Sequence, residues 1–182
     1  MYICIILFIV VIIFAYIMMT YNSLTKSKNR VEEAFSTMDI YLKKRWDLIP
    51  NLVETLKGYA NYEKSTLEKI VELRNNSFNE MNKEDKVNTD YKISKQIENI
   101  IVVAEKYPDL KANEAFKNLS KELAEVEDEI ANARKYYNGT IRILNNKINM
   151  FPSNIVANMM GFTEQKMFEA NMEERENVKI KL

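Results

Sequence analysis

The chain opens with an unbroken apolar segment, Tyr2–Met19, and its first 25 residues carry no charged side chain. Eighteen apolar residues are just enough for a helix that crosses a lipid bilayer. The sequence that follows has the mixed composition of a water-soluble domain. We therefore predict a transmembrane anchor over residues 1–20 and one helical domain over residues 21–182.

A cleaved signal peptide is the alternative interpretation of this apolar segment. Such peptides carry a basic region before the apolar run and small residues at the cleavage site. No Lys or Arg precedes the segment, and Ala15-Tyr16-Ile17 is not a small-x-small site. Cys4 also lies too early for a lipid-attachment cysteine. An anchor that stays attached is the favoured interpretation.

Three basic residues, Lys26, Lys28 and Arg30, follow the apolar segment before any acidic residue. Cytoplasmic flanks of membrane helices collect Lys and Arg. We therefore expect a single-pass protein of the cell membrane, with its N-terminus outside and its domain in the cytoplasm. The same three residues are candidate ligands of anionic lipid headgroups. The alternative is that they form a solvated turn of the helix.

The composition excludes several classes of function. The chain has no histidine, which removes the commonest general base and metal ligand. Its single cysteine lies within the apolar segment, and its three glycines do not cluster into a phosphate-binding loop. The 26 basic and 26 acidic residues cancel, so no excess positive charge favours nucleic acid. We expect no catalytic residue, no cofactor and no bound metal.

An acidic cluster at residues 122–129 is the strongest candidate for metal chemistry. Helical bundles hold di-iron centres with facing Glu residues, but those sites also use a His three residues after a Glu. Because the chain has no His, a carboxylate-only metal site is the minor interpretation. The alternative is a solvated acidic face with partners such as Lys121–Glu125.

Two apolar patterns with alternating steps of four and three residues predict two long helices that pack at a shallow angle. The first pattern is Val31, Phe35, Met38, Leu42, Ile49, Leu52, Leu56 and Tyr59. The second is Phe116, Leu119, Leu123, Val126, Ile130, Ala133, Tyr137, Thr140 and Leu144.

Arg45 occupies the one position of the first pattern that is not apolar. If it points inward, it needs an acidic partner, because an unpaired buried charge is costly. Glu122 and Glu127 of the second long helix are candidates. Alternatively, the stem of Arg45 covers the apolar surface while its charged head reaches water.

Two shorter helices are predicted between the long ones, over residues 61–81 and 91–104, with a polar turn at residues 82–86. A proline at position 108 ends the later one. Short connections make neighbouring helices antiparallel. The expected fold is all-α: an N-terminal transmembrane helix followed by an antiparallel up-and-down four-helix bundle with long helices. Where the shorter helices leave the long ones uncovered, we expect an interaction surface with Trp46 as an aromatic anchor.

Residues 51–59 and 154–162 share a local pattern of Asn, aliphatic residues, Gly and an aromatic residue. Each follows a proline closely, and prolines favour the first turn of a helix. The pattern predicts two short helices.

Several sequence blocks resemble the LemA family over nearly the whole chain and in the same order. They are Asn29-Arg30-Val31-Glu32-Glu33-Ala34, Lys44-Arg45-Trp46-Asp47-Leu48-Ile49-Pro50-Asn51, Tyr107-Pro108-Asp109-Leu110, Ala131-Asn132-Ala133-Arg134-Lys135-Tyr136-Tyr137-Asn138 and Phe151-Pro152-Ser153-Asn154. The resemblance implies a bacterial single-pass membrane protein with a helical bundle and no established activity. Relatives are often encoded beside a membrane zinc metalloprotease or a TPM-domain protein, which implies such a partner. It also implies that Pro50 and Pro152 start or kink helices and that Asn22 and Asn138 form hydrogen bonds between helices.

The leading hypothesis is a membrane-anchored interaction module without catalytic activity, either with a protein partner or as a homo-oligomer. The alternatives are a carboxylate-metal enzyme and an organiser that binds anionic lipid. The candidate structural and interaction residues are Asn22, Arg30, Arg45, Trp46, Pro50, Asn51, Glu122, Glu127, Arg134, Tyr137, Asn138 and Pro152.

Overall fold

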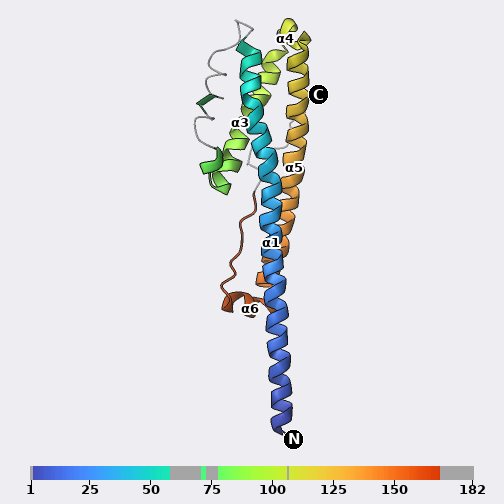
Figure 1. The fold of residues 1–182 in the computed structure, drawn as a ribbon, viewed down its shortest axis with the longest axis vertical. Coiled ribbons are helices and arrows are strands. Elements are labelled where there is room, and N and C mark those ends of the chain that lie inside the picture. The colour runs from blue at the N-terminus through green and yellow to red at the C-terminus, as the bar shows by residue number, and fades with distance from the viewer. Residues whose placement is uncertain (1, 58–70, 73–77, 106, 169–182) are drawn as a thin grey trace, which may run out of the picture. The chain divides into compact units, whose positions relative to one another are not determined.

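The computed structural model describes residues 2–57, 71–72, 78–105 and 107–168, and these residues form helices and no strand. The elements are α1 (Tyr2–Lys57), the 3-10 turn η1 (Phe78–Glu80), α3 (Lys83–Ala104), α4 (Pro108–Ala112), α5 (Glu114–Asn149) and α6 (Ser153–Met159) (Figure 1). The predicted all-α class, with a long apolar helix at the N-terminus, is confirmed.

Helix α1 continues from the apolar segment into the following residues without a break. Its 56 residues make a rod of about 84 Å at 1.5 Å per residue. The apolar side chains of Tyr2–Met19 are largely exposed, and α1 is long and apolar enough to cross a membrane. A proline lies inside this helix at position 50. Of the two predicted roles of Pro50, a helix start is therefore wrong, since Ile49 and Leu52 on both sides of it are buried within the same helix, and a kink stays a prediction.

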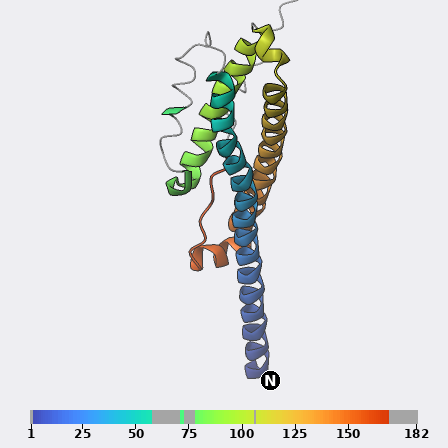
Figure 2. The ribbon, with the colours of Figure 1, turned by 45° about the horizontal axis from the view of Figure 1, so that its top comes forward.

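The chain divides into two compact units, one built from residues 1–35 with 134–182 and the other from residues 36–133. We call the first the terminal unit and the second the bundle unit. Within the bundle unit, α3 runs in the same direction as α1, and α5 runs the opposite way (Figures 1 and 2). An up-and-down bundle requires these directions of its first, third and fourth helices. The second predicted helix, at residues 61–81, lies mostly outside the described residues.

The buried residues of α1 and α5 follow the predicted apolar patterns. Every described member of both patterns is buried, from Val31 to Leu56 and from Phe116 to Leu144; Tyr59 lies outside the described residues. Helix α3 adds Ile93, Ile97, Ile100 and Ala104 to the core of the bundle unit. Ile101, one residue past this buried row, is 40% exposed.

Helix α3 begins earlier than the sequence pattern indicates. The Asp85 backbone N–H donates to Asn82 Oδ1 at 2.9 Å, and Asn82 Nδ2 donates to Asp85 Oδ2 at 2.6 Å. Asn82 thus caps the first turn of a helix, a role that Asn fills well. The prediction of a turn at residues 82–86 is wrong for this reason. The predicted end is confirmed, since α3 stops at Ala104; Pro108 then starts α4, where a missing N–H costs nothing.

Candidate functional site

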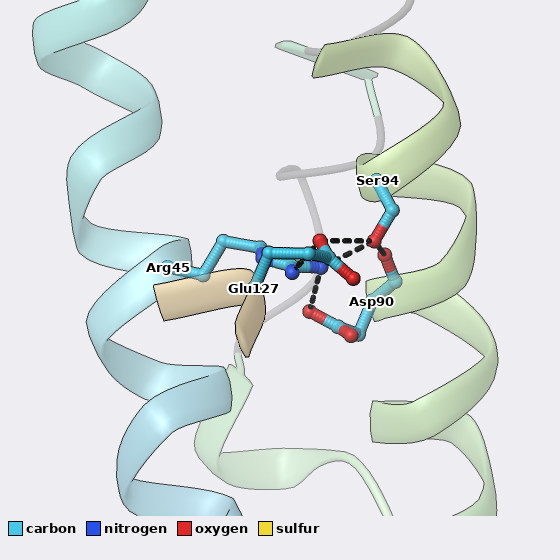
Figure 3. Close-up of polar contacts among 4 residues, drawn as sticks. All are labelled: Arg45, Asp90, Ser94 and Glu127. Atoms are coloured by element: carbon cyan, nitrogen blue, oxygen red, sulfur yellow. Dashed lines mark hydrogen bonds and ion pairs between the residues drawn. The ribbon is translucent and has the colours of Figure 1, made fainter. Parts of the chain in front are cut away.

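A buried arginine joins the three main helices of the bundle unit (Figure 3). Only 1% of the Arg45 side chain of α1 is exposed. Its Nη1 donates to Asp90 Oδ1 of α3 at 2.9 Å and also to Ser94 Oγ. Its Nη2 donates to Glu127 Oε2 of α5. The inward interpretation of Arg45 is therefore confirmed, with Glu127 as one of its two acidic partners.

The second acidic partner of Arg45 is Asp90, which the sequence analysis does not identify as a candidate residue. Asp90 is buried, and it lies three residues before Ile93 and seven before Ile97 on the buried row of α3. A polar residue in line with an apolar row was the signal that could have revealed it, as it did for Arg45. Ser94 completes the group by donating to the Asp90 backbone carbonyl at 3.2 Å and to Glu127 Oε2 at 3.3 Å.

This arginine cluster fixes helix positions and offers no evident chemistry. Glu122, the other proposed partner of Arg45, instead lies 3.2 Å from Lys44 Nζ, and Glu125 lies 3.9 Å from Lys121 Nζ as predicted. These acids pair with cations instead of facing one another. Across the part of the chain that the structure describes, no three His, Cys, Asp or Glu side chains are grouped to hold a metal ion.

Trp46 lies in the core of the bundle unit. Its side chain is 6% exposed, and its ring packs on Phe78 with centroids 5.6 Å apart. Lys86 Nζ lies over the Phe78 ring, 4.5 Å from its centroid, and forms an ion pair with Asp39 at 2.8 Å. The prediction that Trp46 is an exposed anchor is wrong, because η1 brings an aromatic partner that covers it.

Two asparagines of α5 hold the backbone of the segment at residues 162–168, within the terminal unit. Asn138 Nδ2 donates to the Phe168 carbonyl at 2.8 Å, and the Phe168 N–H donates to Asn138 Oδ1 at 3.0 Å. Asn145 repeats this arrangement with Gln165, at 2.8 and 2.9 Å. We call this pair of contacts the asparagine ladder. Asn138 therefore bonds to a non-helical segment, and the prediction that it bridges two helices is wrong.

The spacing of the asparagine ladder follows from geometry. Seven helical residues rise about 10.5 Å. Three residues span at most about 10–11 Å, so the segment from Gln165 to Phe168 must be nearly extended to meet both asparagines. The Phe168 ring also stacks on Tyr137 at 5.1 Å between centroids. Sequence reasoning singled out Asn138 and Tyr137 but gave no sign of the segment that they hold.

Tyr137 is buried between Phe168 and Phe35, whose ring centroid lies 5.7 Å away. Burial raises the pKa of the Tyr137 hydroxyl above its ordinary value, and the negative charge of Glu32 raises it further. The residue thus stays neutral at physiological pH and serves as core.

Lys147 of α5 meets α1 just after the apolar segment. Its Nζ donates to Ser23 Oγ and Ser27 Oγ at 2.8 Å each and to the Ser23 carbonyl at 3.3 Å. An open cavity beside it is lined by Tyr16, Met19, Thr20, Leu24 and Ser153. Sequence reasoning missed this contact, because it joins residues more than a hundred positions apart.

The remaining candidate residues lie near the surface. The exposed ones are Asn22, Lys26, Lys28, Arg30, Asn51 and Pro152, while Arg134 is partly buried on α5. Asn22 is exposed, and its predicted hydrogen bond to another helix stays a prediction. Pro152 precedes the first residue of α6, which confirms its place at a helix start.

These features define an all-helical protein in which an apolar N-terminal helix continues into a bundle fixed by a buried arginine. Residues 34–182 match the LemA family model. The chain is also 30% identical over 158 residues to Protein LemA of Metamycoplasma hominis, covering 86% of this chain and 72% of that protein. The chain belongs to the LemA family.

A shorter similarity connects the chain to Magnetosome protein MamQ 1 and Magnetosome protein MamQ 2 of Paramagnetospirillum magneticum. Each is 31% identical over 70 residues, which is 38% of this chain and 26% of each of those proteins.

Proposed function

We propose that this protein is a membrane-anchored scaffold of the LemA type, which binds another protein and catalyses no reaction itself. The observation that carries the proposal is an exposed apolar stripe, formed by Tyr136 and Ile143 on α5 and Met150 directly after its end, which are 55%, 50% and 63% exposed. Residues seven apart lie on one face of a helix. Exposed apolar side chains repeated on one helix face are typical of interaction sites, and a stripe of this kind suits an amphipathic helix of a partner.

The anchor supports this proposal by fixing where the partner is found. A lipid environment would cover the exposed apolar side chains of Tyr2–Met19. The basic residues Lys26, Lys28 and Arg30 favour a cytoplasmic domain. A Cys4→Ser variant with Lys121→Cys tests this orientation, because position 121 is 79% exposed. We expect a membrane-impermeant thiol reagent to label it only after cell lysis; labelling of intact spheroplasts would reverse the orientation.

Family resemblance suggests which partners to test first. They are a membrane zinc metalloprotease and a TPM-domain protein, and a second copy of this chain is the other candidate. A photo-crosslinking residue at Ile143 should give an adduct with one of them in native membranes. The same residue at Lys121 is the matched control, since it lies exposed on α5 away from the stripe. If position 143 gives no protein adduct where the protein is abundant, the proposed interface is wrong.

A further inference from the structure

We propose that α6 and the turn before it enter the interfacial layer of the bilayer beside α1. This inference rests on the proposed anchoring and adds a second point of membrane contact. Four apolar side chains form the contact surface, which we call the α6 corner. They are Phe151, Ile155, Met159 and Met160, with exposed fractions of 79%, 58%, 60% and 45%.

The α6 corner is one face of an amphipathic helix whose other face is already packed. Val156 and Ala157 are 3% and 0% exposed, which fixes α6 on the terminal unit. Ile155 and Met159 are four residues apart, so they lie one above the other on the opposite face. A short helix that buries one apolar face and presents another outward needs a second apolar environment.

The position of α6 along α1 indicates what that environment is. Ser153 of α6 lines the same cavity as Tyr16, Met19 and Thr20 of α1. The ring of Phe162, which follows α6, contacts Tyr21 with centroids 6.0 Å apart. The α6 corner therefore lies level with the end of the apolar segment. Within the terminal unit, α6 projects sideways from α1 at this level, and α1 continues alone toward the N-terminus (Figures 1 and 2).

The side chains at this level follow the order of layers in a bilayer surface. Tyr16 and Tyr21 are 38% and 43% exposed, and Tyr is enriched where acyl chains meet headgroups. The described contacts of the Lys147 ammonium are with uncharged oxygens of Ser23 and Ser27, which leaves its charge without a carboxylate among the residues that the structure describes. Lipid phosphates complement such a cation. The outward apolar side chains of the α6 corner, with the Lys147 cation of α5 held at Ser23 and Ser27 just past the apolar segment, fit a membrane surface better than a soluble partner.

Depth-dependent quenching of a fluorophore tests this inference with the full chain. An environment-sensitive dye is attached to a single cysteine, and the protein is reconstituted into vesicles of phosphatidylcholine and phosphatidylglycerol that contain nitroxide-labelled lipid. Three positions are compared. The wild-type Cys4 reports the anchor, Phe151→Cys in a Cys4→Ser background reports the α6 corner, and Tyr136→Cys in the same background is a control. Tyr136 is an exposed aromatic residue of α5 in the same unit, about 21 Å along the helix from Met150.

We expect lipid nitroxide to remove most of the emission at positions 4 and 151 and little at position 136. Quenching at 151 should be strongest with a nitroxide near the headgroup. Position 4 lies two residues from the far end of the apolar segment, so a headgroup nitroxide of the opposite leaflet should quench its dye most strongly. If the dye is quenched at position 4 but responds at position 151 as it does at 136, the α6 corner does not touch the membrane. If position 4 is not quenched, the anchoring itself is wrong.

Discussion

Arg45 and Asp90 form an ion pair at 2.9 Å, and their side chains are 1% and 5% exposed. Each charge has lost almost all contact with water, so each is stabilised by the close opposite charge of the other. A buried pair adds little net stability compared with apolar residues of the same size, but removal of one member leaves an uncompensated charge. Because of this asymmetry, the pair favours the arrangement of the two helices in which Arg45 of α1 meets Asp90 of α3.

Replacement of Arg45 should therefore destabilise the protein strongly. For Arg45→Met we expect a loss of about 3–5 kcal/mol in the free energy of unfolding, because Asp90 is left buried and charged. Glu127→Gln is the matched control, since that side chain is 53% exposed and its ion pair should contribute less than about 1 kcal/mol. Urea denaturation followed by circular dichroism measures both. Equal losses for the two variants would show that burial does not set the cost.

The apolar row of α5 gives a second comparison. Leu123 is 3% exposed, so Leu123→Asp should prevent folding, because burying a lone carboxylate costs several kcal/mol. Lys121→Asp should be tolerated, since position 121 is 79% exposed. A domain is stable by only about 5–15 kcal/mol, so the two variants should differ in melting temperature by a wide margin. Similar melting curves would contradict the assignment of the buried face.

Tyr137 should make the protein sensitive to alkali. Its raised pKa means that the folded state keeps the hydroxyl proton at a pH where the unfolded state, with a pKa of 10.0, has lost it. Stability is therefore full below about pH 10 and falls as the pH rises through the pKa of the folded state. In Tyr137→Phe this part of the decline should disappear. The measurement is the urea midpoint between pH 9 and pH 11, about one unit either side of the unfolded value.

The asparagine ladder should protect backbone amides of the segment that it holds. Loss of two hydrogen bonds in Asn138→Ala, at roughly 1 kcal/mol per bond, should speed hydrogen exchange at the Phe168 amide about thirtyfold. Asn145→Ala should do the same at Gln165. Asn146→Ala is the control, because Asn146 is exposed on α5 beside the ladder. Unchanged exchange in both ladder variants would mean that the segment is held by its side chains instead.

Removal of residues 1–20 should leave a soluble and strongly helical domain. The described apolar core begins at Leu24, so the deletion takes away no apolar core side chain, although it removes the buried Thr20. The remaining chain is long enough to bury a core of its own. Circular dichroism should show a helical spectrum with a cooperative thermal transition. A variant that aggregates or melts without cooperativity would mean that the apolar segment is needed for folding.

The helices of this protein were predictable where burial repeats along the sequence. The rows that contain Phe35 on α1 and Leu123 on α5 were correct at every described position, since a heptad pattern directly reports a buried face. The start of α3 was missed, because Asn82 and Asp85 suit both a turn and a helix cap. Only tertiary context separates those two outcomes.

The sites were less predictable than the helices, because they depend on contacts between distant residues. Arg45 was noticed since it interrupts an apolar row, but the choice between water and an acid depended on α3. The burial of Trp46 depended on Phe78, whose position relative to α1 no local pattern encodes. The asparagine ladder joins residues twenty and thirty positions apart. Because the asparagines contact the backbone of Gln165 and Phe168, the side-chain types at these two positions do not reveal the contacts.

Because the ladder binds backbone groups, it limits which mutations the segment at residues 162–168 can accept during evolution. The asparagines contact the amide groups of Gln165 and Phe168, so the exposed side chains of Lys166 and Met167 are free to vary. One residue inserted between these two contacts would move Phe168 by about 3.3 Å, beyond the reach of a hydrogen bond. Between the two contacts, point mutations at positions 166 and 167 are tolerable and single-codon insertions are not, so inheritance here preserves a length more strictly than a sequence.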